Sequence, residues 1–147
     1  MRYLILGSSG QIGSALCEYY KNKGHTVDEF DIVNGKHQDL RIDKSSFLYD
    51  KISKSDFVFF LAFDVGGSRY LKKYEKTFDF IQNNMKIMLN TFECLQSTQK
   101  PFIFSSSQMS DMNFSPYGTL KRIGEYYTEA LDGLSVKFWN IYGTEQD

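Results

Sequence analysis

Residues 7–13 read Gly7-Ser8-Ser9-Gly10-Gln11-Ile12-Gly13 and separate two apolar patterns of different period. Before them stands the short apolar run Tyr3-Leu4-Ile5-Leu6, and after them apolar residues recur at helical spacing up to Tyr20. This order predicts a strand, a glycine turn and a helix. In such a turn, glycines spaced G-x-x-G-x-x-G let backbone N–H groups approach a pyrophosphate at the positive end of the helix dipole. The same spacing also fits a tight turn that holds no ligand.

Length and composition indicate one domain, residues 1–147, that is large enough for a real core. The net charge of −1 gives no basic footprint for nucleic acid. Lys72, Lys73 and Lys76 form a basic stretch, but an acid interrupts them, which favours a solvated helix face. No stretch approaches the roughly 20 apolar residues of a membrane span, and Gly7 ends the first apolar run too early for a signal peptide. We therefore expect no nucleic-acid partner and no membrane partner.

The residues that often bind metals show no metal-ligand pattern. Cys17 and Cys94 fall inside expected helices, far apart in the sequence, and the chain has two histidines, both in turn-like contexts. Free, buried cysteines are typical of a reducing compartment. We therefore expect no metal site and a cytoplasmic location.

Strands and helices are expected to alternate along the whole chain. The expected strands are 2–6, 26–31, 37–40, 57–62, 101–105 and 134–140, and the expected helices are 11–22, 45–52, 78–96 and 117–131. This alternation predicts the α/β class, with a doubly wound parallel sheet of the Rossmann type. Five residues at or just beyond the expected strand ends should line one rim of that sheet, where ligands bind: Gly7, Asp31, Ala62, Ser107 and Asn140.

An acidic residue ends the second expected strand. Asp31 lies 18 residues after Gly13, where a carboxylate can accept both ribose hydroxyls of an adenosine and would repel a 2′-phosphate. This position favours NAD over NADP as the cofactor, although an ordinary aspartate at a turn also fits. Asp39 follows the short expected strand and could face the adenine.

A second group of residues suggests chemistry at the same rim. Tyr117 and Lys121 are four residues apart, hence on one helix face, and Ser107 precedes them. A phenol with its ordinary pKa near 10 is a weak base at neutral pH. A nearby ammonium group favours the phenolate, so we expect the pKa of Tyr117 to be lowered. Tyrosinate can then take a hydroxyl proton while hydride leaves the adjacent carbon, with the serine orienting the oxygen. A surface Tyr-Lys pair without function is the alternative.

Together these motifs resemble the extended short-chain dehydrogenase/reductases, specifically the NAD-dependent nucleotide-sugar epimerase/dehydratase family. The matching motifs, in chain order, are Gly7 with Gly10 and Gly13, Asp31, Asp39-Leu40-Arg41, Leu61-Ala62, Ser105-Ser106-Ser107, Tyr117 with Lys121, and Phe138-Trp139-Asn140-Ile141-Tyr142-Gly143. The resemblance covers essentially the whole chain.

For the cofactor, the resemblance implies that the loop from Gly7 to Gly13 holds the pyrophosphate, with backbone contacts from Gln11 and Ile12. It implies that Asp31 holds the adenine ribose and that Asp39 and Leu40 contact the adenine. Further residues implied along the cofactor are Leu61 and Ala62 beside it, and Asn84, which supports the active site.

For catalysis, the resemblance implies a triad of Ser107, Tyr117 and Lys121, in which Lys121 also reaches the nicotinamide ribose. Asn140 matches an asparagine beside the sugar nucleotide. Helices matching 78–96 and 117–131 often pair across a two-fold axis in the family, which implies a homodimer.

The chain departs from the family pattern in three ways. It stops just after the sixth expected strand and so lacks most of the usual C-terminal substrate-binding part. Nine residues separate Ser107 from Tyr117, fewer than usual, which leaves Ser106 as an alternative to Ser107. Gln108-Met109 stands where sugar dehydratases carry an acid pair, which disfavours dehydration.

Epimerase or reductase chemistry therefore fits better, and the loop Val65-Gly66-Gly67 resembles the GDP-sugar epimerase/reductase branch. The leading hypothesis is an NAD-dependent nucleotide-sugar epimerase or reductase that works by hydride transfer. The alternative is a truncated, non-catalytic module for NAD binding or dimerisation.

Overall fold

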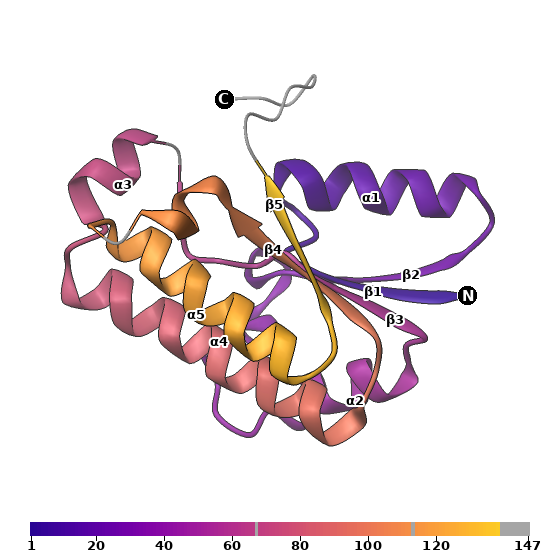
Figure 1. Ribbon diagram of the computed structural model, residues 1–147. Helices are drawn as coiled ribbons and strands as arrows, with labels where there is room; N and C mark the ends of the chain where they lie inside the picture. The colour runs from indigo at the N-terminus through magenta and orange to yellow at the C-terminus, as the bar shows by residue number, and fades with distance from the viewer. Residues whose placement is uncertain (67, 113, 139–147) are drawn as a thin grey trace.

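Five short apolar runs form the strands of one parallel sheet in a computed structural model, which describes residues 1–66, 68–112 and 114–138 (Figure 1). The strands are β1 (Arg2–Leu6), β2 (Thr26–Phe30), β3 (Phe57–Phe60), β4 (Phe102–Ser107) and β5 (Leu134–Phe138). The helices are α1 (Gln11–Asn22), α2 (Ser46–Lys54), α3 (Ser68–Tyr74), α4 (Phe78–Thr98) and α5 (Pro116–Ala130). This arrangement confirms the predicted α/β class.

Both faces of the central strands are buried, which explains why their sequences are apolar without alternation. On β1, Leu4 and Leu6 point into the larger core, beneath α2, α4 and α5, whereas Ile5 points to the other face and packs near Cys17 of α1. Figure 1 shows the same division, with α1 on one side of the sheet and α2, α4 and α5 on the other. The fold is therefore doubly wound, as expected.

The strand order is β2-β1-β3-β4-β5, so the chain turns to opposite sides of β1 after α1 and after α2. In open sheets of this kind the switch point lies between the two central strands, and ligands bind beyond their carboxyl ends. Here that point lies between β1 and β3. The loops that follow β1, β2 and β3 converge there.

The predicted third strand over 37–40 is wrong. The chain instead forms two short 3₁₀ helices, η1 (Ile32–Asn34) and η2 (Lys36–Gln38), joined by Gly35. Local hydrogen bonds replace sheet pairing, because the Asp31 carboxylate accepts from the Val33 N–H and the Gln38 side chain accepts from the Asp31 N–H. The described sheet therefore has five strands where six were expected.

Helix α3 was not predicted, because its short sequence starts within a stretch that we expected to be a loop. The other elements lie within a few residues of their predicted bounds. Strand β4 continues past the expected end at residue 105 to Ser107, and a third short 3₁₀ helix, η3 (Gln108–Asp111), leads from it towards α5.

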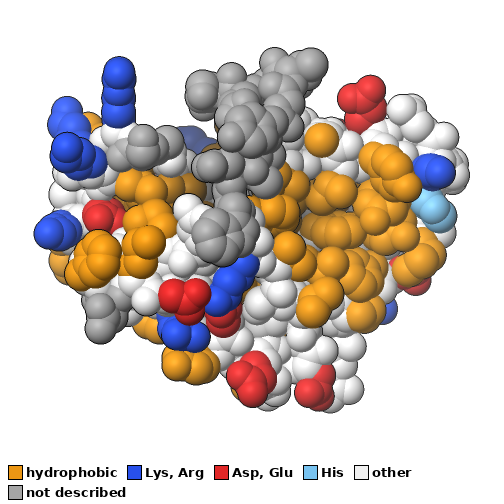
Figure 2. Space-filling model, turned by 45° about the horizontal axis from the view of Figure 1, so that its top comes forward, with side chains coloured by type: hydrophobic (Ala, Val, Ile, Leu, Met, Phe, Trp, Pro, Cys, Tyr) orange, Lys and Arg blue, Asp and Glu red, His pale blue; other side chains and the backbone are white. Residues whose placement is uncertain are grey.

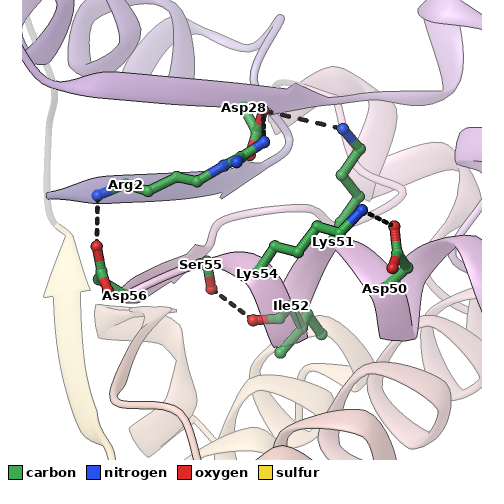
Figure 3. A network of polar contacts seen from close by, with 8 residues as sticks. All are labelled: Arg2, Asp28, Asp50, Lys51, Ile52, Lys54, Ser55 and Asp56. Carbon is green, nitrogen blue, oxygen red and sulfur yellow. Dashed lines mark hydrogen bonds and ion pairs between the residues drawn. The ribbon is translucent and has the colours of Figure 1, made fainter.

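Charged side chains near the amino ends of the strands bind one another (Figure 3). Arg2 of β1 donates to Asp28 of β2 over 2.7 Å, and Lys51 of α2 lies 3.9 Å from the same carboxylate. The backbone N–H of Arg2 also donates to Asp56, just before β3. These contacts join three strands and one helix at the end of the sheet opposite the switch point. Among the described helices, none is both long and apolar enough to cross a membrane.

Candidate functional site

Two hollows adjoin at the carboxyl ends of the strands. The first, of about 370 Å³, lies over the switch point and is lined by residues of the loops after β1, β2 and β3. The second, of about 270 Å³, extends to the end of β4 and the start of α5. Both are lined by Gly7, Gly10, Leu61, Phe63 and Val65, so they form one continuous depression.

The predicted site residues divide between these hollows. The first is lined by Asp31, Asp39, Leu40 and Ala62 in addition to the shared residues. The second is lined by Gln11, Ile12, Gly13, Ser107, Tyr117 and Lys121. Of the predicted residues that the structure describes, Asn84 alone lines neither hollow, and Asn140 lies outside the described residues.

The glycine turn is tightly packed at one glycine and open at another. A Cβ on Gly13 would overlap the carbonyl oxygen of Gly7, so no other residue fits there without movement. A Cβ on Gly10 would find the nearest atom 3.6 Å away, so the protein's own packing does not require glycine at this position. Gly10 lines both hollows, and its missing side chain leaves room for a ligand to approach the backbone.

The start of α1 lacks the capping that other helices have. Side chains of Ser45, Thr77 and Ser115 cap α2, α4 and α5, whereas Gly10 at the start of α1 offers none. The side-chain nitrogen of Gln11, in the first turn, is buried without a hydrogen-bond partner in the described structure. An uncapped helix start with an unsatisfied donor fits a bound anion such as a pyrophosphate.

The Asp31 carboxylate lies at the edge of the first hollow, held by the backbone. It accepts from the N–H groups of Ser9, over 3.0 Å, and Val33, over 3.2 Å. A carboxylate has about four acceptor positions, so the oxygens can still accept from ligand hydroxyls. The Gln38 side chain accepts from the Asp31 N–H over 2.9 Å and also lines the hollow. This role was not predicted from the sequence, because Gln38 is far from the glycine turn along the chain.

Asp39 is engaged by a residue of its own motif. Arg41 donates to both Asp39 oxygens, over 2.9 and 2.8 Å, and this pairing lowers the pKa of Asp39. Arg41 lines the first hollow as well. The spacing of two residues between Asp39 and Arg41 is the feature of the sequence from which this ion pair could have been predicted. Asp39 thus holds a guanidinium group at the wall where an adenine contact was expected.

Asn84 is fully buried in α4 and acts on the loop after β3. Its side chain accepts from the Asp64 N–H over 2.7 Å and donates to the Asp64 carbonyl oxygen over 3.0 Å. It thereby fixes the backbone of a residue that lines the first hollow. This arrangement fits the expected role of Asn84 as a support for the site.

Ser107 and Tyr117 both line the second hollow. The neighbouring Ser107 side chain lowers the pKa of Tyr117, but burial raises it more, and the net pKa lies above the usual value. The neighbouring Ser106 donates to Glu125 over 2.7 Å, so its hydroxyl is already occupied. These contacts support Ser107 over Ser106 as the residue beside Tyr117.

Lys121 lies behind Tyr117 in a nearly dry position. It is 3% exposed, donates to the Ser105 carbonyl oxygen over 2.8 Å, and burial lowers its pKa to about 7. The expectation that Lys121 lowers the pKa of Tyr117 is not met here. The Lys121 nitrogen donates to a backbone carbonyl instead and lies 5.9 Å from the centre of the Tyr117 ring. Burial also disfavours the charged form of both groups.

Phe63 joins the two groups and was not predicted. The Lys121 nitrogen lies 4.0 Å from the centre of its ring, and the Tyr117 ring meets it edge-on at 5.8 Å. The ring face favours the charged form of Lys121, which offsets part of the cost of burial. Its only sequence signal is its place directly after Leu61-Ala62.

Within residues 1–66, 68–112 and 114–138, no three metal-binding side chains come together. The site thus offers a cradle for an anion, acceptors for hydroxyl groups, and a half-buried tyrosine and serine. Such a set suits a dinucleotide placed across both hollows, with its reactive end at Tyr117.

Comparison with known proteins agrees with this geometry. The profile of the NAD dependent epimerase/dehydratase family matches residues 3–147. No curated protein sequence matches the chain. Similar solved structures include a dTDP-4-dehydrorhamnose reductase of Clostridium acetobutylicum, with 19% identity and a TM-score of 0.78 over 100% of this chain and 56% of that one.

Two further structures were solved with different cofactors. A GDP-D-glycero-L-gluco-heptose synthase of Campylobacter jejuni, solved in the presence of NADPH, has 19% identity and a TM-score of 0.81 over 99% of this chain and 49% of that one. The UDP-glucose 4-epimerase of Thermus thermophilus, in complex with NAD, has 19% identity and a TM-score of 0.76 over 100% and 58%. At such identities the likeness shows the fold, and the chain spans about half the length of these proteins.

Proposed function

The chain belongs to the NAD dependent epimerase/dehydratase family, and we propose that it carries the cofactor and hydride-transfer site of a nucleotide-sugar epimerase or reductase. The observation that carries this proposal is the junction of the two hollows. A glycine turn suited to a pyrophosphate lies at their shared floor, with Asp31 at one end and the Ser107–Tyr117 pair at the other.

The cofactor is NAD rather than NADP. Asp31 already accepts two backbone N–H groups, and its remaining acceptor positions suit the two hydroxyls of a ribose. A 2′-phosphate would bring negative charge against this carboxylate. Because similar structures hold NAD in one case and NADPH in another, the preference rests on Asp31 itself.

When bound, the nicotinamide ring accepts a hydride and returns it. Ser107 orients the reacting oxygen of the sugar, and Tyr117 takes or gives the hydroxyl proton. Lys121 holds the nicotinamide ribose, and its pKa of about 7 makes the charge that it offers there depend on pH near neutrality. Gln108 and Met109 provide no acid pair for dehydration, so the substrate is epimerised or reduced.

Replacement of Tyr117 by phenylalanine tests this role, because it removes the proton carrier and keeps the ring. With UDP-, GDP- and dTDP-sugars as substrates, we expect the variant to lose at least about 100-fold in hydride transfer, with NAD binding unchanged. Tyr126→Phe is the control, since Tyr126 lies on the same helix and is 62% exposed. Equal turnover in the two variants would remove Tyr117 from the mechanism.

A second candidate is a non-catalytic module that binds NAD or dimerises. It is favoured by the apolar side chains that α4 and α5 leave exposed. Exposed apolar side chains on α4 and α5 would form the interface of a homodimer: Phe78, Ile81, Leu89 and Tyr126. Tight NAD binding without turnover of any nucleotide sugar would support the module, and sedimentation of the purified protein tests the dimer.

A further inference from the structure

Helix α3 and the turn after it carry four cationic side chains. Arg69, Lys72, Lys73 and Lys76 follow the spacing i, i+3, i+4, i+7, which places the helical ones on one face. All four are exposed. The opposite face, with Tyr70 and Leu71, packs against the larger core. The sequence suggested a solvated helix face, and the structure adds where that face lies.

These cations have no ion-pair partner among the described residues, although lysines elsewhere do. Figure 2 shows Lys and Arg side chains gathered on the left of the molecule, the side on which Figure 1 places α3. In a chain with net charge −1, this is a local concentration of unneutralised positive charge.

The acid of the same segment is turned away from the cations. The Glu75 carboxylate accepts from the Ser115 hydroxyl over 3.0 Å and from the Tyr117 N–H over 3.4 Å, at the start of α5. Its charge therefore stabilises the amino end of that helix. Glu75 also ties the segment to the residue proposed as proton carrier.

The other end of α3 is tied to the first hollow. The Tyr70 hydroxyl donates to Asp64 over 3.4 Å, and Asp64 lines that hollow. The cationic segment is thus anchored on one side to the first hollow and on the other to the second. The helix that carries the cations is therefore attached at the rim of the depression, although the cationic side chains themselves line neither hollow.

We propose that Arg69, Lys72 and Lys73 bind the diphosphate group of the nucleotide-sugar substrate. This inference rests on the proposed function. The pyrophosphate of the cofactor has its own receptor in the glycine turn and the start of α1, so the cations of α3 fit a second diphosphate. Lys and Arg bind phosphate oxygens through charge-assisted hydrogen bonds, and their field also speeds the arrival of an anionic substrate.

The test uses protein saturated with NAD, so that the cofactor site is filled, and GDP as the probe, with guanosine as its uncharged counterpart. The variant Arg69→Gln/Lys72→Gln/Lys73→Gln is compared with Lys23→Gln/Lys54→Gln/Lys100→Gln. The control removes the same charge from positions at or just after the ends of helices that lead into strands, at the opposite end of the sheet. Melting curves check that both variants are folded.

We expect the dissociation constant for GDP to rise about tenfold in the α3 variant and less than about twofold in the control, with the difference shrinking at high salt. Equal GDP affinity in the two variants, or no GDP binding by the native protein, would overturn the inference. Failure to bind NAD would instead overturn the proposed function, and the GDP titrations would still report on the α3 cations.

Discussion

At the amino ends of the strands charged groups are paired, whereas among the described residues at the carboxyl ends a buried ammonium group lacks a counter-charge and a buried amide lacks a hydrogen-bond partner. Arg2, Asp28 and Lys51 bind one another at the first end (Figure 3). At the other end Lys121 is buried without a carboxylate partner in the described residues, and the side chain of Gln11 has an unsatisfied donor. Groups left unsatisfied in an otherwise well-packed fold mark the surface that a ligand completes.

Substitution of one glycine at each end of the sheet tests this contrast, and we expect these variants to show the largest difference in stability. Gly13→Ala places a methyl group against the Gly7 carbonyl oxygen and should cost about 3 kcal/mol in unfolding free energy, with loss of NAD binding. Gly24→Ala, at the amino end, meets no atom within 4 Å and suffers only from its φ of +84°, so it should cost about 1 kcal/mol. Denaturant unfolding and NAD titration measure both. Similar losses in the two variants would break the contrast.

Lys121→Met should raise stability near neutral pH, because it removes a buried charge. Burial lowers the pKa of Lys121 from 10.5 to about 7. The folded protein therefore binds fewer protons than the unfolded chain between these values, and native stability rises with pH across that window. Below about pH 7 the full cost of the charge is present, and the variant should be more stable there by on the order of 3 kcal/mol.

The matched control is Lys54→Met, which removes an exposed lysine paired with Asp50. Urea unfolding at several pH values should show a difference between native protein and Lys121→Met that shrinks as pH rises. For Lys54→Met the difference should stay small and flat. A Lys121→Met variant that is less stable at every pH would mean that the lysine is held by contacts stronger than its burial cost.

Asp31, just after β2, and Asp28, within β2, are expected to affect different properties: cofactor binding for the first and stability for the second. Asp31→Asn should weaken NAD binding about tenfold and raise the affinity for NADP relative to NAD, since it removes the charge that opposes a 2′-phosphate. Asp28→Asn should leave the ratio of the two affinities unchanged and lower stability by about 1 kcal/mol, because it breaks the ion pair with Arg2. Calorimetric titration with each cofactor decides. An unchanged ratio in Asp31→Asn would contradict the preference for NAD.

Phe63→Leu should have the smallest effect. It keeps an apolar wall between the hollows but removes the ring face 4.0 Å from the Lys121 nitrogen. We expect the pKa of Lys121 to fall by less than about one unit, which corresponds to the loss of about 1 kcal/mol of cation–π energy. The pH dependence of stability reports this shift as a midpoint at lower pH. A midpoint at higher pH would mean that the ring opposes the charge.

Local patterns predicted the elements and the rim, but they could not predict side-chain environment. The strand, glycine turn and helix of residues 2–22 follow from periodicity and glycine spacing, and the structure matches them. The stretch 37–40 reads as a strand by composition, yet Gly35 and the side chains of Asp31 and Gln38 hold it in 3₁₀ turns. Pairing partners of this kind are set by tertiary contacts.

The same limit applies to the site. The spacing of Tyr117 and Lys121 predicted their shared helix face, but the pKa of each depends on burial. Lys121 also lies over the ring of Phe63, which comes from the loop after β3. The contact between Glu75 and the start of α5 joins residues 40 positions apart and leaves no local pattern. The sequence therefore predicts which residues reach the rim, because they follow the strand ends. It does not predict which of them contact one another, because the fold sets those contacts.

The most direct measurement of the central claim, that the carboxyl rim is a working NAD site, is calorimetric titration of NAD into the purified native protein and into Gly13→Ala. We predict one NAD per chain in the native protein, NADP at least about tenfold weaker, and no binding in the variant. Absence of binding by the native protein, or equal binding by Gly13→Ala, would contradict the claim.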